Sequence, residues 1–260
     1  MAKDFSFKEI YKQFNSLNNS GYFSNATNKE SVDEQYANKQ NKNEEPKTKG
    51  KIYEKKPEPP LSHNHVLYTD LLKMSYQQLV DYMLLKYGPV PGDYFLTESC
   101  KSKNITIPRI KEGLYCHHID EDKAIMLSNT EFAIKHPFEY QKANRLIYCN
   151  IIEHLVIHIK IAEEHKGEIT VNNELVGIGG AAQLICRQIN DCYSDKVFVQ
   201  DYMNIIRGQI ADHFDEYIAI LKYLWDLINN DHLYSLMYKK EDLCMSFDGA
   251  IVNRVYQALQ

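Results

Sequence analysis

Four of the ten histidines have a spacing that could support chemistry. His154 and His158 are four residues apart in the segment NIIEHLVIHIKI, where the apolar pattern predicts a helix. Both imidazoles then project from one helix face, about one turn apart, which is a common way to supply two nitrogen ligands to one metal ion. His117 and His118 are adjacent in GLYCHHI, a predicted strand, so their side chains point to opposite faces. One of them can therefore join the helix pair as a ligand, and the other is left for proton transfer.

Two short strands and a helix must position these histidines. The first strand is predicted over residues 113–119 and is followed by a polar, irregular stretch. The second strand is predicted over residues 146–149. Asn150 then offers an N-cap, and Glu153 completes a capping box for a helix that runs to about Glu164.

The same histidines do not fit a zinc protease. The motif H-E-x-x-H needs Glu directly after the first helix histidine, and Leu155 stands there. The inverted motif H-x-x-E-H needs His where Asn150 stands. The sequence thus lacks the carboxylate that would activate water for peptide hydrolysis.

A strand with His-His, a loop, a second strand and a helix with His-x3-His together resemble the HNH, or ββα-metal, nuclease family. The resembling stretch is Gly113–Ile161, with HHID near its start and NRLIYCNIIEHLVIH near its end. The resemblance implies that His117, His154 and His158 hold one divalent metal ion. It also implies that His118 is the general base.

The stretch departs from the family's pattern at one place. Counting back from the first helix histidine, the middle Asn of the family falls at Arg145, and Asn144 stands one place earlier. In the family this Asn braces the loop and does not perform the chemistry. The resemblance therefore implies a structural role for Asn144, with altered loop geometry.

Such a site would hydrolyse a phosphodiester bond. Imidazole titrates near neutrality, so His118 could take the proton of the attacking water, while a divalent ion polarises the phosphate and stabilises the departing oxygen. Imidazole ligands suit Zn, Ni, Co or Mn better than Ca, and Mg fits if phosphate and water complete its shell. The resemblance implies a metal-dependent endonuclease acting on nucleic acid, most simply DNA, in a setting of bacterial defence, restriction or a mobile element.

Other functions remain open at this point. An RNA-cleaving toxin could use the same motif on RNA. A non-catalytic binding module could use the metal only to staple the helix to the strands, and the histidines could also bind no metal at all. Replacing His118 with Ala separates the enzyme from the module, because only the enzyme has turnover to lose.

Charged side chains flank the histidines. Three basic residues are candidate contacts to substrate phosphates, with surface charge as the alternative. They are Arg109, Lys111 and Arg145. Three acidic residues could add metal ligands, although acidic loop residues are usually solvated. They are Asp120, Glu121 and Asp122. Glu153 is interpreted as a helix cap, and the run Gly177-x-Gly-Gly lacks the G-x-G-x-x-G spacing of a nucleotide fingerprint.

Composition bounds the class of protein. The chain has 260 residues, of which 44% are hydrophobic and 25% charged, so it can bury a sizeable core. No run approaches the roughly 18 apolar residues of a membrane helix, and the N-terminus has no apolar signal region, so we expect no membrane partner and a cytoplasmic location. The six cysteines form no C-x-x-C pair, which argues against a zinc ribbon or a redox dithiol. A homo-oligomer is compatible with these features.

Charge and pattern also divide the chain. The formal net charge is −5, and residues 1–60 contain 11 Lys and 9 Asp or Glu, so the remainder carries about −7. An acidic body weighs against nucleic acid unless a metal supplies local positive potential. We predict a disordered arm over residues 1–60 with a short helix near 5–17. Residues 61–260 are predicted to form one α+β, predominantly helical domain, with the HNH-like core at about 113–165 and a helical C-terminal part.

Overall fold

The computed structural model describes residues 66–170 and 175–260. The arm expected over residues 1–60, with its short helix, lies outside the described residues. From Leu67 onward the described residues belong to one compact unit. They are mostly helical and include a small two-stranded sheet, so the α+β, predominantly helical class is confirmed.

The sheet and the helix that follows it appear where the sequence predicts them. β1 (Tyr115–His118) and β2 (Leu146–Cys149) pair in antiparallel orientation, and α7 (Ile151–Glu164) begins directly after β2. The predicted capping box is present, because Asn150 and Glu153 each bond the backbone N–H of the other. These bonds satisfy donors that the first turn of a helix otherwise leaves unpaired.

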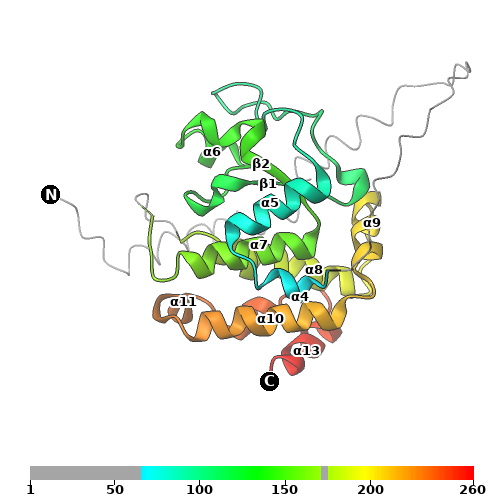
Figure 1. Ribbon diagram of the computed structural model, residues 1–260. Coiled ribbons are helices and arrows are strands. Elements are labelled where there is room, and N and C mark those ends of the chain that lie inside the picture. Colours follow the sequence, from blue (N-terminus) through cyan, green and yellow to red (C-terminus); the bar gives the residue numbers. More distant parts are fainter. Residues whose placement is uncertain (1–65, 171–174) are drawn as a thin grey trace, which may run out of the picture. The chain divides into compact units, whose positions relative to one another are not determined.

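α7 is buried on nearly every side. It packs against β1, α4 (Tyr68–Leu71), α5 (Tyr76–Tyr87) and α10 (Phe214–Asn229), and these helices surround it in Figure 1. A helix with apolar residues on most of its faces requires such surroundings. Its fully buried apolar residues include Leu155, Val156, Ile157, Ile159 and Ile161.

Short helices provide most of the remaining structure. Around β1 and before β2 they are η1 (Ile110–Glu112), η2 (Ile119–Asp122), α6 (Thr130–Ala133), η3 (Phe138–Gln141) and η4 (Ala143–Arg145). After α7 they are η5 (Gly180–Ile185), α8 (Cys186–Tyr193), α9 (Asp201–Ile210), α11 (His232–Met237), α12 (Lys240–Cys244) and α13 (Gly249–Ala258). The chain after α7 is helical, as the sequence predicts for its C-terminal part, and α9 and α10 are separate helices.

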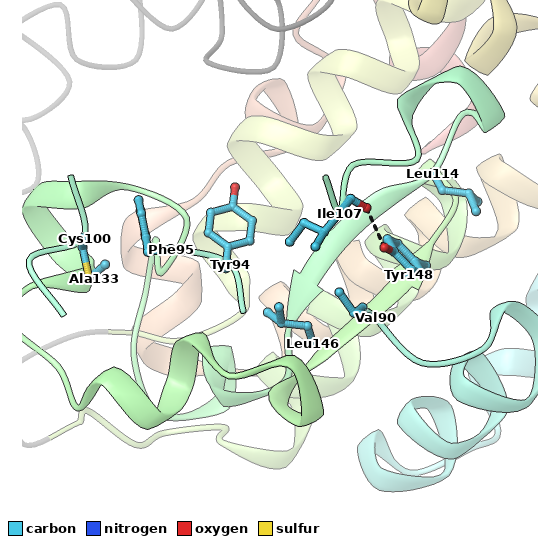
Figure 2. Packing of buried hydrophobic residues seen from close by; sticks show 9 residues of the cluster. All are labelled: Val90, Tyr94, Phe95, Cys100, Ile107, Leu114, Ala133, Leu146 and Tyr148. Atoms are coloured by element: carbon cyan, nitrogen blue, oxygen red, sulfur yellow. Dashed lines mark hydrogen bonds between the residues drawn. The ribbon is translucent and has the colours of Figure 1, made fainter. Parts of the chain in front are cut away.

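One face of the sheet packs on a hydrophobic cluster (Figure 2). Leu146 and Tyr148 supply the β2 side of this cluster, and the Tyr148 hydroxyl donates to the carbonyl of Ile107 at 2.5 Å. His118 is the register partner of Leu146, so its side chain lies on the same face. His117, its neighbour in β1, is therefore on the opposite face of the sheet.

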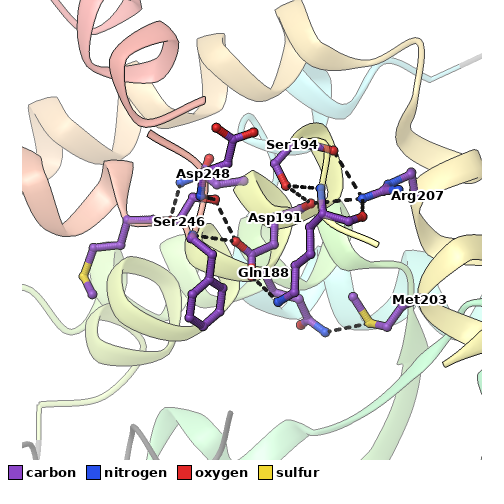
Figure 3. A network of polar contacts seen from close by, with 11 residues as sticks. Gln188, Asp191, Ser194, Met203, Arg207, Ser246 and Asp248 are labelled. Atoms are coloured by element: carbon purple, nitrogen blue, oxygen red, sulfur yellow. Dashed lines mark hydrogen bonds and ion pairs between the residues drawn. The ribbon is translucent and has the colours of Figure 1, made fainter. Parts of the chain in front are cut away.

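A buried polar network ties the C-terminal helices together (Figure 3). The carboxylate of Asp191 accepts from the Ser246 hydroxyl at 2.7 Å and pairs with the Lys196 ammonium at 2.8 Å. Arg207 of α9 donates to the carbonyls of Cys192 and Lys196. These bonds satisfy polar groups that α8 carries into the interior, which is the condition for burying them.

Two expectations from composition also bear on the fold. All six cysteines are free thiols. Within the described ranges, no helix is both long enough and apolar enough to cross a bilayer.

Candidate metal centre

Four side chains converge on one point of the structure. They are His117 of β1, Glu121 of η2, and His154 and His158 of α7, and each offers one donor atom within 4.8 Å of the others. The three histidines are those that the sequence predicts as metal ligands. The expectation that the acidic loop residues are solvated is wrong for Glu121, because the short helix η2 turns its side chain back toward His117.

Three separations between donor atoms are close to those around a small transition-metal ion, and all four atoms lie within 4.8 Å of one another. His158 Nε2 lies 3.2 Å from His154 Nε2 and 3.2 Å from Glu121 Oε2, and His117 Nδ1 lies 3.6 Å from the same oxygen. Four donors at about 2.0–2.2 Å from one tetrahedral ion are about 3.3–3.6 Å from each other. His117 Nδ1 is buried and has no hydrogen-bond partner in the described part of the chain. A buried nitrogen left in this way is explained if it faces a ligand.

The protonation states also suit a cation. Burial lowers the pKa of His117 to about 3, and burial together with the neighbouring imidazoles lowers the pKa of His154. Burial raises the pKa of Glu121, but the close approach of His158 and His117 outweighs it and holds that pKa below its usual range. Neutral imidazoles and an ionised carboxylate are the forms that bind a metal.

Tyr76 of α5 orients one of the imidazoles. Its hydroxyl donates to the carbonyl of Ile119 at 2.5 Å and lies 3.4 Å from His117 Nε2. Because the single hydroxyl proton goes to Ile119, the oxygen accepts from His117 Nε2–H. The lone pair of His117 is then on Nδ1, the nitrogen that faces Glu121.

His118 lies apart from this cluster, on the other face of the sheet. Its side chain contacts Tyr94 with ring centroids 4.4 Å apart, and it is 1% exposed. Its Nε2 is 2.9 Å from Gln141 Oε1. The sequence leaves His118 for proton transfer, but the structure encloses it in the interior, because strand alternation turns it away from the other three histidines.

Gln141 performs the bracing expected of Asn144. The Gln141 amide nitrogen donates to the carbonyl of Leu127 at 3.2 Å, and its oxygen faces His118. Asn144 is exposed in the next short helix, η4. Gln141 could not be picked out from the sequence, because it is one of many polar residues in its stretch. Glu121 could be considered as a ligand because it is an acidic residue only four positions after His117.

The candidate phosphate contacts are mostly engaged by carboxylates. The Arg145 guanidinium donates twice to Asp120, at 2.6 Å each, and Arg109 pairs with Glu112. Both guanidiniums thus form ion pairs in this structure, and the substrate contact expected of them stays a prediction. Lys111 is exposed. Asp120 is held by Arg145, and Asp120 and Asp122 are not among the four converging side chains.

No protein-family model, curated protein or solved structure matches the chain. The interpretation of the site therefore rests on its residues and their geometry.

Proposed function

We propose that this chain is a metal-dependent nuclease of the ββα-metal type that hydrolyses phosphodiester bonds in DNA. The observation that carries the proposal is the convergence of donors from a strand, from the turn after it and from the helix that follows the second strand. This order of elements agrees with the resemblance of Gly113–Ile161 to the HNH family.

Three imidazoles and one carboxylate would hold the ion. This donor set suits Zn, Mn or Ni, and it suits Mg less because Mg prefers a shell of oxygens. When bound, the ion would polarise a phosphate oxygen, stabilise the leaving oxygen and supply positive charge to a chain of net charge −5.

In this proposal His118 keeps the role of proton acceptor that the resemblance implies, and the structure encloses it on the sheet face opposite the four donors. The carbonyl of Leu127 can only accept, so the Gln141 amide nitrogen faces it and Gln141 Oε1 faces His118. His118 Nε2 is then the protonated nitrogen, and the lone pair is on Nδ1. Because the side chain is 1% exposed, its action requires water to reach Nδ1 when substrate binds.

A second candidate function has its own supporting observation. Glu121 brings the number of protein donors to four, and a tetrahedral site with four protein ligands is typical of structural zinc. In that case the ion only joins α7 to β1 and η2, and the chain is a metal-stabilised binding module.

Cleavage assays on the purified full chain distinguish these functions. We would incubate the protein with supercoiled plasmid and with total RNA, after EDTA treatment and after separate additions of Zn²⁺, Mn²⁺, Ni²⁺ or Mg²⁺. The expected result is metal-dependent nicking or linearisation of the plasmid. His154→Ala and His118→Ala should each lose it, and His118→Ala should still bind the metal.

His165→Ala is a matched control. His165 is the C-cap of α7, outside the cluster, and contacts Glu168 at 3.0 Å. The His165→Ala variant should cleave plasmid as the wild type does. Cleavage of RNA alone would indicate the toxin, and a wild type that binds metal without cleaving either substrate would favour the structural site.

A further inference from the structure

A glycine-rich turn, Gly177–Gly180, follows the two strands in sequence and lies against α7, the helix that carries two of the metal ligands. Gly177 has φ +76°, and a Cβ there would meet the backbone nitrogen of Ala162 at 2.5 Å and the carbonyl oxygen of His158 at 2.6 Å. A Cβ on Gly180 would meet the His158 ring at 2.6 Å from both Cε1 and Nδ1. Larger residues at these two positions would therefore push the turn away from α7 or displace the imidazole.

The close approach gives the His158 ring a specific partner. Its Nδ1 lies 3.2 Å from the carbonyl oxygen of Gly177. A carbonyl only accepts, so Nδ1 carries the proton and donates it. The lone pair of His158 is then on Nε2, which faces Glu121 Oε2 and His154 Nε2 at 3.2 Å each.

We propose that the turn Gly177–Gly180 is a positioning element for the metal ligand His158, fixing both its tautomer and its ring orientation. The proposal rests on the metal centre and does not require that the centre be catalytic. Hydrogen bonds of this kind orient ligating histidines and raise their basicity, and their loss typically weakens metal binding about 10–100-fold.

The backbone next to the turn supports this positioning role for Gly177–Gly180. η5, which begins at Gly180, is a π-helix and packs on α7. Such elements are rare and occur frequently at functional sites. The turn also lies outside Gly113–Ile161, so the resemblance to the nuclease family does not include it.

The first test compares two glycine substitutions by Zn²⁺ affinity, measured by competition with a chelating dye. Gly180→Ala should bind Zn²⁺ about 10–100-fold more weakly than the wild type. Gly208→Ala is the matched control, because Gly208 lies in α9 and a Cβ there meets nothing within 4 Å. It should bind within about twofold of the wild type. Equal affinity of Gly180→Ala and wild type would overturn the proposal.

The second test reads the position of the proton directly in the wild type. Long-range ¹H–¹⁵N spectra of the Zn²⁺-loaded wild type report which nitrogen of each histidine carries the proton, and a His158→Asn variant assigns the signal. We expect His158 to be protonated on Nδ1, and protonation on Nε2 would refute the proposal. A wild type that binds no metal ion would overturn both the centre and this inference, whereas absence of nuclease activity would affect only the proposed function.

Discussion

The start of α7 offers the sharpest test of how the fold positions the two helix histidines. Glu153 is fully buried, and its carboxylate accepts from the Asn150 backbone N–H at 2.8 Å, the Tyr87 hydroxyl at 2.8 Å and the Lys86 ammonium at 2.5 Å. Glu153→Ala removes the carboxylate that accepts all three hydrogen bonds. The helix that carries His154 then loses half of its capping box.

The cost follows from those contacts. Loss of the capping interaction costs about 1 kcal/mol, and loss of the Tyr87 bond costs about 1 kcal/mol. The Lys86 side chain is 39% exposed, so losing this ion pair adds only about 1 kcal/mol, at the lower end for charged bonds. We therefore expect Glu153→Ala to lower the free energy of unfolding by about 3 kcal/mol.

Urea denaturation of the metal-free protein, followed by circular dichroism, measures this change. Glu139→Ala is the control, because Glu139 is an exposed carboxylate of η3, and it should stay within about 0.5 kcal/mol of the wild type. A change below about 0.5 kcal/mol for Glu153→Ala would refute the reasoning that the Glu153 carboxylate stabilises the start of α7.

Two further predictions concern the metal and the flanking basic residues. Removing the metal with EDTA should lower the melting temperature measured by calorimetry by about 5–11 °C relative to protein with free metal at 100 times Kd, because metal binding then adds about 2.7 kcal/mol to the free energy of unfolding. His154→Ala should show no such difference. A wild type whose melting temperature does not respond to EDTA would contradict the metal centre. Arg145→Ala should lower the free energy of unfolding by about 1–3 kcal/mol, because the buried Asp120 carboxylate, which is 1% exposed, loses its bidentate ion pair. Unchanged stability together with a raised KM for DNA would instead support the substrate role expected from the sequence.

Local patterns were sufficient to predict the core of the site. A residue pair four apart shares a helix face whatever surrounds the helix, so His154 and His158 could be paired from the sequence. Side chains alternate between the two faces of a strand, so only one of His117 and His118 can lie beside the helix histidines. The structure shows that this one is His117. The capping box of Asn150 and Glu153 was likewise a local signal, and it fixes where α7 begins.

Contacts between distant segments could not be predicted in this way. Gln141, Tyr76 and Gly177 reach the histidines across 23, 41 and 19 residues of sequence, and no periodicity relates such positions. Arg145 is close to the helix histidines in sequence, but its guanidinium forms an ion pair with Asp120 of η2. A basic residue close to a motif is therefore a weak indication of a substrate contact.

Relations along one helix face or one strand follow from the backbone repeat, so the residue order alone established which histidines can meet. The contact of Glu121 with the three histidines, the enclosure of His118 by Gln141 and Tyr94, and the glycine turn on His158 depend on packing. Packing brings together segments that lie far apart along the chain, and the groups it places within a few ångströms set burial, tautomer and pairing.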